Sequence, residues 1–306
     1  MAGTSSVPVI VRGGISRREL LATGALMLTG AARANSVASP PRVAALGWSC
    51  AQALLALGLT PLVVPEIERY RRLVVEPAIP TEVSEIGLRS EPNFELLRQL
   101  TPDLIVIDPG LASARARLER IAPVDVFTTL APGRRPLATS QEAMRQLAAR
   151  LGLDTACARY LARFETVMDD YRAEAAGYRG GPLYLVHEMF RNRALVFGGT
   201  SLYQDVLDRF GLRNAWTGPS SLYGHIVVGL EELAGVPKAR LVLVNSRAAD
   251  FERLLRTHPF LGSLPAVRAS RITVLPDVHF SGGVPAAERF ARLLADRLPK
   301  DDDGRG

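Results

Sequence analysis

Cysteine is scarce in this sequence of 306 residues, which contains only Cys50 and Cys157. Two thiols cannot form the disulfide framework of a small secreted domain, and they cannot hold a zinc ion without further ligands. They allow at most one bridge, and two free thiols are equally consistent with the sequence. Since typical domains have ~150 residues, the chain is expected to form about two domains, each large enough to bury its own core.

Lysine is also nearly absent, because the chain has only Lys238 and Lys300. The formal net charge of +6 therefore comes from arginine, and residues 1–34 carry four arginines against one acid. Without that segment 33 basic and 30 acidic residues remain, and no run of bases is interleaved with aromatic residues. Scattered arginine of this kind does not form the basic stripe typical of nucleic-acid binding, so no nucleic-acid partner is expected.

Long apolar runs are missing as well. The apolar stretch from Leu20 to Gly30 has about eleven residues, well short of the ~20 that span a bilayer. It follows a twin-arginine pattern at residues 16–21 (SRRELL) and precedes a small-x-small cleavage form at residues 32–34 (ARA). These features predict a twin-arginine signal peptide over residues 1–34, cleaved after Ala34, and a soluble product in a bacterial periplasm.

Motifs of the common catalytic sites do not occur in the sequence. It has no G-x-G-x-x-G after a predicted strand, no Walker lysine and no G-x-S-x-G elbow. His187 has no second histidine four residues on, which excludes a zincin motif. His225 and His279 stand in glycine-containing segments after predicted elements, where cleft residues tend to lie. An iron or zinc site made of these two histidines and a carboxylate stays open at this point.

Short apolar runs alternate with helical segments along the rest of the chain. Strand, helix, strand is the order of a parallel βαβ unit, and continuous apolar runs are typical of buried parallel strands. The expected elements are strand 42–48, helix 50–58, strand 61–65, helix 94–100, strand 103–108, strand 195–198, helix 201–211, helix 229–235 and strand 241–245. The pattern predicts two similar α/β halves.

A helical connector is expected between these halves. Residues 140–176 are rich in Ala, Arg, Leu and Glu with apolar residues at helical spacing, and Gly152 divides them into two helices. The longer helix, with Asp154 as its N-cap, would span on the order of 30 Å at 1.5 Å per residue. The predicted parts are an N-terminal α/β lobe, a connecting helix and a C-terminal α/β lobe, at residues 35–147, 148–177 and 178–306. Such a protein places its ligand cleft between the lobes.

Several blocks of the sequence resemble one family in order along nearly the whole length after the signal. They are residues 42–48 (RVAALGW), 54–58 (LLALG), 76–77 (EP), 86–93 (IGLRSEPN), 120–123 (RIAP), 195–198 (LVFG), 201–202 (SL) and 214–216 (NAW). The G-L-R-x-E-P-N block is the most specific of them. The chain resembles the bacterial periplasmic ferric hydroxamate siderophore-binding proteins, class III bilobal proteins that deliver cargo to ABC importers. The resemblance implies two parallel-sheet α/β lobes joined by a long connecting helix.

The resemblance also implies a cargo pocket in the cleft. A ferric trihydroxamate is close to neutral overall, whereas its iron-bound oxygens carry partial negative charge, so one guanidinium fork and aromatic walls suit it. By motif, Arg89 takes the cargo-binding arginine position and Trp48 takes the aromatic position after the first strand. The other positions that the resemblance brings to the pocket are Leu111, Tyr223, His279, Phe280 and Ser281, and His225 is a further candidate because of its glycine-containing segment.

The sequence departs from the family pattern at some of these positions. Leu111 stands where the family has a tyrosine that donates to a cargo oxygen, and Leu73 occupies a tryptophan position. His279 and Ser281 are more polar than the aromatic residues they replace. Our hypothesis is that His279, His225 or Tyr223 supplies the missing donor, so the departures bear on which siderophore is bound.

The partners implied by the resemblance are a ferric hydroxamate siderophore and an inner-membrane ABC importer permease. Similar proteins present one acidic residue per lobe to the permease, and Glu231 matches the second-lobe position, with Glu119 as the candidate in the first lobe. A monomer without catalysis or cofactor is expected. The same fold with cobalamin, haem or another metal chelate as cargo is the nearest alternative, and a periplasmic α/β enzyme is a more distant one.

Overall fold

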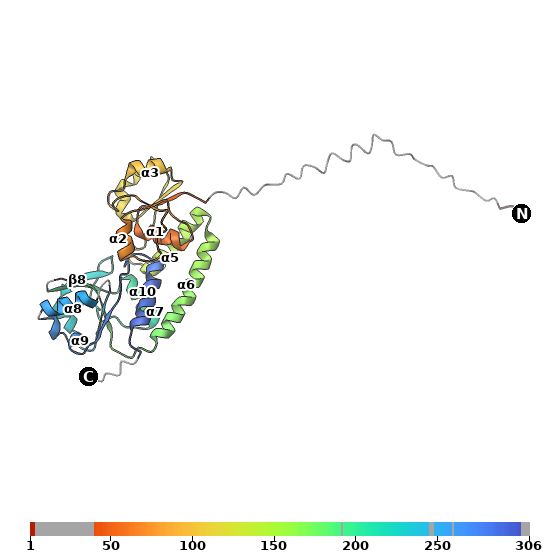
Figure 1. Ribbon diagram of the computed structural model, residues 1–306. Helices are drawn as coiled ribbons and strands as arrows, with labels where there is room; N and C mark the ends of the chain where they lie inside the picture. Colours follow the sequence, from red (N-terminus) through yellow and green to blue (C-terminus); the bar gives the residue numbers. More distant parts are fainter. Residues whose placement is uncertain (4–39, 191, 245–247, 259, 301–306) are drawn as a thin grey trace. The chain divides into compact units, whose positions relative to one another are not determined.

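The computed structural model describes residues 1–3, 40–190, 192–244, 248–258 and 260–300 (Figure 1). The described residues from Pro41 to Lys300 belong to one compact unit. Beyond residue 3, the predicted signal segment lies outside the described residues, and so does its predicted cleavage site after Ala34. None of the helices described is both long enough and apolar enough to cross a membrane.

The first lobe is built on a three-stranded parallel sheet in the order β1-β4-β5, with β1 at Val43–Ala45, β4 at Leu104–Ile107 and β5 at Val124–Val126. Every residue of β1 and β4 is buried, as expected for parallel strands covered on both faces. Its helical elements are α1 (Trp48–Ala56), α2 (Ile67–Leu73), α3 (Phe94–Leu100), the 3-10 helix η1 (Pro109–Ala114) and α4 (Arg115–Leu118).

The expected β-α-β unit at the start of the first lobe is formed differently. β2 (Val63–Val64) pairs with β3 (Ser84–Glu85) in a separate two-stranded sheet, and the ladder partner of β1 is β4. The chain just before β2 still lies against β1, since the Leu62 N–H donates to the Val43 carbonyl at 2.7 Å. The helix and both strands are therefore present as predicted, although the first strand ends at Ala45 and the helix already begins at Trp48, and the pairing of the strands differs.

Two helices, α5 (Pro136–Leu151) and α6 (Asp154–Ala175), follow the first lobe. The predicted break at Gly152 is confirmed, because this residue ends α5 with a φ of 69° that favours glycine. Asp154 is not the N-cap as predicted, because it is the first residue of α6, after Leu153. The 22 residues of α6 give it a length of about 33 Å at 1.5 Å per residue. Figure 1 shows α6 running beside both lobes.

The second lobe has a five-stranded sheet in the order β10-β9-β6-β7-β8. Its strands are β6 (Leu183–Phe190), β7 (Arg193–Phe197), β8 (His225–Gly229), β9 (Arg240–Leu243) and β10 (Ile272–Val274). β10, β9 and β6 are parallel, whereas β7 is antiparallel to both β6 and β8. Only residues 191–192 separate β6 from β7, too few for a parallel crossover, so the predicted parallel sheet is confirmed only for those three strands.

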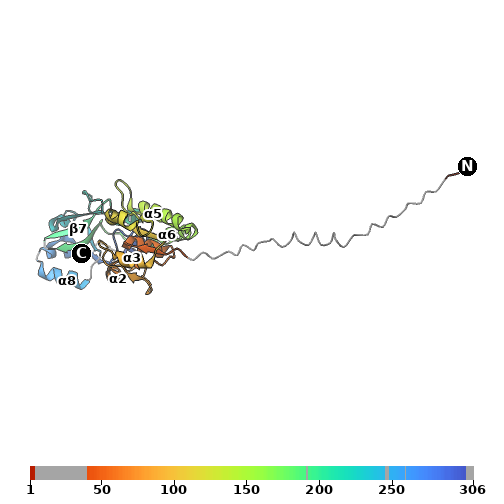
Figure 2. The same cartoon turned by 90° about the horizontal axis from the view of Figure 1, so that it is seen from above.

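The helical elements of this lobe are α7 (Leu202–Phe210), the 3-10 helix η2 (Leu230–Ala234), α8 (Ala248–Thr257), the 3-10 helix η3 (Leu261–Ser263), α9 (Pro265–Arg268) and α10 (Val284–Arg297). The predicted helix 201–211 is confirmed, with Ser201 as its N-cap and Gly211 as its C-cap. The segment expected as a helix at 229–235 is the 3-10 helix η2 instead. In both views α8 lies on the side away from α6 (Figures 1 and 2).

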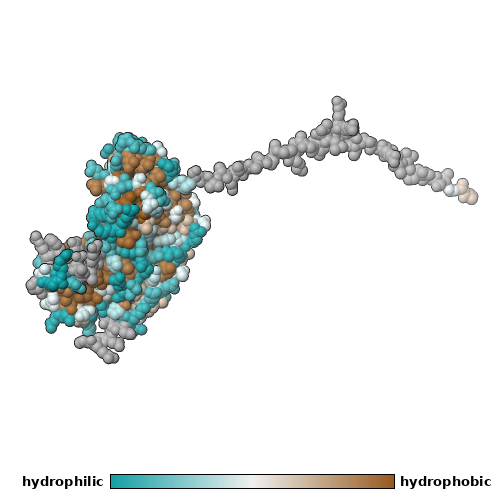
Figure 3. Space-filling view, in the orientation of Figure 1, coloured by the Kyte–Doolittle hydropathy of each residue, from teal (hydrophilic) through white to brown (hydrophobic). Residues whose placement is uncertain are grey.

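One hydrophobic core runs through both lobes. It contains residues of β1 and α1 from the first lobe, of α6, and of α7 and α10 beside the second lobe. Tyr203 and Phe290 stack at its centre with ring centroids 4.2 Å apart, and both are fully buried. Hydrophilic residues are interspersed with small hydrophobic patches on the face shown in Figure 3, as expected when most large apolar side chains lie inside. This shared core fixes the two lobes against α6.

Candidate functional site

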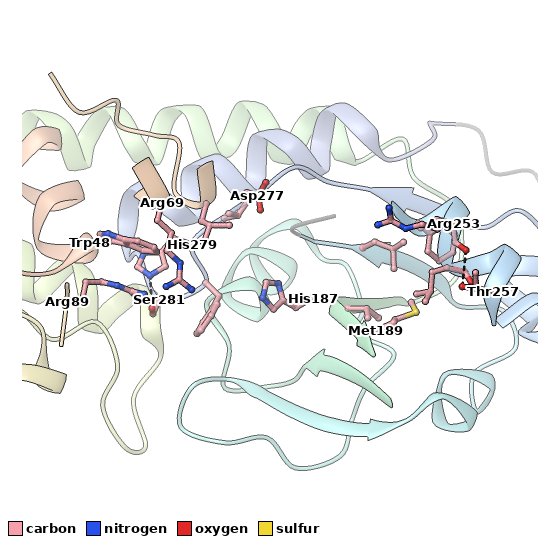
Figure 4. Close-up of a pocket in the computed structure, with 17 residues that line it drawn as sticks. Trp48, Arg69, Arg89, His187, Met189, Arg253, Thr257, Asp277, His279 and Ser281 are labelled. Carbon is pink, nitrogen blue, oxygen red and sulfur yellow. Dashed lines mark hydrogen bonds between the residues drawn. The ribbon is translucent and has the colours of Figure 1, made fainter. Parts of the chain in front are cut away.

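A cavity of about 810 Å³ lies between the two lobes, within the ~300–1,000 Å³ typical of small-molecule sites. Its lining residues are Trp48, Arg69, Leu73, Arg89, Val186, His187, Met189, Leu243, Phe251, Arg253, Leu254, Thr257, Asp277, Val278, His279, Phe280 and Ser281. Figure 4 shows the first-lobe residues with His279 and Ser281 at one end and residues of α8 at the other, with His187 between them. β6 and β9 contribute residues near their carboxyl ends, where open α/β sheets bind ligands.

Arg89 reaches the cavity from a loop whose shape the G-L-R-x-E-P-N block explains. Gly87 has a φ of 94°, which favours glycine, and it bridges to Pro92. Asn93 then caps α3, since its side chain accepts hydrogen bonds from two backbone N–H groups of the first turn. The loop therefore turns back on itself and leaves Arg89 near its tip, and the most specific block of the sequence is the one that presents this side chain.

The Arg89 guanidinium lies over the indole of Trp48, with its Cζ 3.7 Å from the ring centroid. Its Nε donates to Glu66 Oε2 at 2.6 Å, and its side chain is 37% exposed. Trp48 is buried, and its Nε1–H donates to the Pro65 carbonyl at 2.9 Å. A cation over an aromatic face is attracted to it, so this contact and the bond to Glu66 hold the guanidinium in place at the cavity.

His279 is held in a chain of hydrogen bonds beside Trp48, whose ring is 5.6 Å from the imidazole at an angle of 75°. Gln52 donates through Nε2 to the Glu76 carbonyl at 2.8 Å, which directs its Oε1 at His279 Nδ1, 3.1 Å away. Assigned from this network, Nδ1 carries the proton and Nε2 accepts from the Ser281 hydroxyl at 3.1 Å. Burial, with the nearby charge of Arg89, lowers the pKa of His279 to about 3, so the ring is neutral.

This burial predicts a particular dependence of stability on pH. In the unfolded chain the His279 pKa returns to ~6.5, so below that pH the unfolded state binds a proton that the folded state does not. The free energy of unfolding should therefore fall as the pH drops from about 6.5 towards 3, by up to ~1.4 kcal/mol per pH unit from this group. His279→Phe should lose that contribution. Urea unfolding at about pH 7 and about pH 5 measures it, and an equal change in both proteins would contradict the prediction.

Aromatic rings continue from the cavity wall toward the surface. Phe280 lines the cavity, and the His225 ring stands perpendicular to it at 5.5 Å. Tyr223 stacks on the outer side of His225, with centroids 6.1 Å apart, and is 57% exposed. His225 and Tyr223 are thus absent from the cavity lining, and the His225 ring adjoins it at Phe280. Burial lowers the pKa of His225 below its ordinary value.

Leu111 lies in a second, adjoining cavity of about 500 Å³ that Arg69 and Arg89 also line. It is buried in the core of the first lobe, and its side chain has no polar atom, so it contributes packing alone. Asp108 borders the same cavity and accepts hydrogen bonds from the Ser49 hydroxyl and the Cys50 thiol. Burial raises the pKa of Asp108 above its usual range despite these bonds.

The predicted residues thus fall into two sets. The structure brings Trp48, Arg89, His279, Phe280 and Ser281 together on one cavity, and it places Leu111, Tyr223 and His225 beside that cavity. Several other lining residues were not predicted as ligand-binding from the sequence: Arg69, His187, Met189, Phe251, Arg253, Thr257 and Asp277. Arg69 stands in the charged run 68–72 (ERYRR), which is typical of a solvated helix face, and only the position of α2 distinguishes it from its neighbours.

The metal site left open by the sequence is not assembled in the described part of the chain. No group of three or more His, Cys, Asp or Glu residues there is placed to hold a metal ion. Both ring nitrogens of His279 are engaged by Gln52 and Ser281, which removes it as a ligand. The two cysteines are buried and free, so of the two thiol states considered the structure has the unbridged one.

The two acidic residues expected to meet a permease lie on the surface. Glu231 is exposed in η2. Glu119 is exposed at the end of α4, and its Oε1 accepts from Arg115 Nε at 2.7 Å. Both side chains are therefore accessible, as docking requires. Their role in docking stays a prediction.

Comparison with known proteins agrees with this architecture. The model of the periplasmic binding protein family matches residues 43–278, and the chain belongs to that family. It is 34% identical over 284 residues to the iron(3+)-hydroxamate-binding protein FhuD of Escherichia coli (strain K12), covering 92% of this chain and 95% of that protein.

Solved structures have the same bilobal class III fold. The siderophore-binding protein FhuD of Vibrio cholerae, bound to Fe3+-Desferal, matches with a TM-score of 0.79 at 24% identity, over 85% of this chain and 98% of that one. The periplasmic catecholate-siderophore binding protein VctP of Vibrio cholerae matches with a TM-score of 0.62 at 19% identity, over 84% and 94%. Proteins of this one fold are thus named for different chelates, so the choice of cargo rests on the side chains of the cavity.

Proposed function

We propose that this protein captures ferric hydroxamate siderophores in the cavity between its lobes and delivers them to an ABC importer in the inner membrane. The observation that carries the proposal is the Arg89 guanidinium, stacked on Trp48 at one end of the cavity. The 34% identity to an iron(3+)-hydroxamate-binding protein over most of both chains supports the same cargo class. The task is binding and release, and it needs no chemical step.

The chemistry of the cavity suits such a cargo. Glu66 occupies the Nε of Arg89, so the two terminal nitrogens of the fork are those that meet the iron-bound oxygens, as a bidentate donor does. Phe280 offers ring surface to the organic shell, while the buried Trp48 supports the guanidinium from behind. The hydrogen bond that the family tyrosine would donate cannot come from Leu111. His279 uses both ring nitrogens within the protein, so of the three donors in our hypothesis Tyr223 and His225 remain, and both lie beside the cavity, where His225 adjoins Phe280.

Export and assembly are further parts of the proposal. The twin-arginine motif and the small residues around Ala34 support export through the twin-arginine pathway, cleavage after Ala34 and a periplasmic product. The lobes would extend over residues 35–147 and 178–306 with the connector at 148–177, a division supported by the position of α6 at Asp154–Ala175. The protein would act as a monomer and dock on the permease through Glu231 and Glu119.

The test is an equilibrium dialysis series with the purified chain. Ferrichrome, ferrioxamine and coprogen represent ferric hydroxamates, and a ferric tris-catecholate, cobalamin and haem represent the competing cargoes. Saturable retention of at least one hydroxamate, at lower concentration than any competitor, is the expected result. Retention of cobalamin, haem or the catecholate alone would leave the family assignment unchanged but would show that the cargo is not a ferric hydroxamate. Retention of none of these ligands would overturn the proposal.

A further inference from the structure

Glu66 occupies an unusual position at the start of α2. It is the residue before the helix and has left-handed backbone angles, with φ 49° and ψ 52°, a conformation that non-glycine residues seldom adopt. Its side chain does not cap the helix. The first helical N–H, that of Ile67, is instead bound by Glu85 Oε2 at 3.0 Å. Because Glu85 takes over the capping, the Glu66 carboxylate is available for other partners.

Those partners are two arginines that line the cavity. Glu66 Oε1 accepts from Arg69 Nη1 at 3.1 Å, and Glu66 Oε2 accepts from Arg89 Nε at 2.6 Å. The Cζ atoms of Arg69 and Arg89 lie 5.9 Å and 3.7 Å from the centroid of the Trp48 ring. Two guanidiniums therefore share one aromatic platform, and a single carboxylate, only 15% exposed, lies between them.

The carboxylate is ionised in this setting. Burial by itself would raise the pKa of Glu66, but the hydrogen bonds and charges of Arg89 and Arg69 outweigh it, and the pKa is lowered. Glu66 thus cancels one of the two positive charges at this end. The larger cavity is also lined by one further pair of opposite charge, Arg253 and Asp277, so with Glu66 present a single positive charge remains in excess among these five side chains.

We propose that Glu66 is a specificity-determining residue, which tunes the site to near-neutral ferric chelates and disfavours polyanionic ones. This inference rests on the proposed function and deepens it. Without Glu66, two adjacent guanidiniums would face the cargo unbalanced, an arrangement that favours a tri-anionic chelate far more than a neutral one because the Coulomb energy scales with the cargo's charge. The carboxylate also leaves Arg89 its two terminal nitrogens, so the hydrogen bonds to a neutral cargo persist.

The test compares Glu66→Gln with a matched control, Glu68→Gln. Both changes remove one carboxylate from the same short segment, but Glu68 is 85% exposed and pairs with Arg71, away from the cavity. Dissociation constants are measured for ferrichrome, a neutral trihydroxamate, and for a tri-anionic ferric tris-catecholate. Glu66→Gln should improve the catecholate affinity relative to ferrichrome by at least about ten-fold, and the improvement should shrink at high salt. Glu68→Gln should leave the ratio within about two-fold of wild type, because exposed charges are screened.

A second variant distinguishes an effect of charge from an effect of Glu66→Gln on folding alone. Arg69→Gln removes a positive charge from the same cluster and should move the ratio the opposite way, toward ferrichrome. An unchanged ratio in Glu66→Gln, or an equal shift in Glu68→Gln, would overturn the role of Glu66. Binding of ferrichrome by the wild-type protein tests the proposed function separately. If the wild type binds ferrichrome and Glu66→Gln has the same ratio of catecholate to ferrichrome affinity as the wild type, only the inference about Glu66 is refuted. A wild type that prefers the catecholate refutes both.

Discussion

Replacing Arg89 with alanine is expected to lower the affinity for a ferric hydroxamate by about 100-fold. Hydrogen bonds that involve a charged group contribute about 1.5–3 kcal/mol each, so losing two of them removes roughly 3 kcal/mol, or about two orders of magnitude in the dissociation constant. Arg89→Lys keeps the charge but not the planar fork and should lose about ten-fold. Titration of the purified variants with ferrichrome measures both effects.

Arg98 offers the matched control for this series. It is an arginine of the same lobe, on α3, with a side chain 51% exposed and paired with Glu95, and it is absent from the cavity lining. Arg98→Ala should bind ferrichrome as the wild type does. If Arg89→Ala loses less than about three-fold in affinity while its melting temperature is unchanged, Arg89 contributes less than ~1 kcal/mol and does not hold the cargo.

Reversing the charge of Glu231 should abolish siderophore uptake by cells and leave cargo binding by the purified protein unchanged. Glu231 is exposed in η2 and absent from the cavity lining, so Glu231→Lys should not alter the site. An acidic docking residue is expected to meet basic groups of the permease, so a lysine in its place puts like charges face to face, which costs several kcal/mol at an interface. Uptake of labelled ferrichrome in cells that carry the variant as their sole copy measures the effect.

Glu95→Lys is the control for this charge reversal, because Glu95 is 71% exposed on α3 and has no proposed docking role. It should support normal uptake. Glu119→Lys tests the first-lobe contact in the same assay, and we expect it to lose uptake as well. Normal uptake with Glu231→Lys at wild-type protein levels would exclude docking through this residue.

The elements with strong local signals were predictable from the sequence. The apolar run 103–108 contains β4, because a strand buried on both faces must be apolar throughout. Gly152 and Gly211 end their helices with positive φ values, which a glycine adopts at little cost. The blocks that carry the family resemblance extend along most of the chain, so the order of the two lobes followed as well.

Strand pairing was less predictable, since it depends on contacts distant in sequence. Nothing local to residues 61–65 indicates that β2 pairs with β3 and not with β1. The antiparallel β6 and β7 pair was missed because no strand was predicted at residues 183–190, and β7 also starts before the apolar run that marked it in the sequence. The helix expected at 229–235 is too short for its apolar spacing to separate an α-helix from a 3-10 helix.

The site was predictable to the extent that a motif marked it. Arg89 and Trp48 stand in blocks that carry the resemblance, and the structure stacks one on the other. Tyr223 follows the pattern of the family in sequence, yet it lies next to a turn at Gly224, with a φ of 81°, and is largely exposed. Arg69 and Glu66 carry no motif at all, because their importance arises from the way α2 meets the loop of Arg89 in space.

Binding in the cavity beside Trp48 is the central claim, and the fluorescence of this one residue tests it most directly. Trp48 and Trp216 are the two tryptophans of the chain, and Trp216 is absent from the cavity lining, so Trp216→Phe leaves Trp48 as the sole reporter. Titration with ferrichrome should quench most of the remaining emission, saturably and with the dissociation constant found by dialysis. Binding by dialysis without quenching of Trp48 would place the cargo elsewhere and contradict the account.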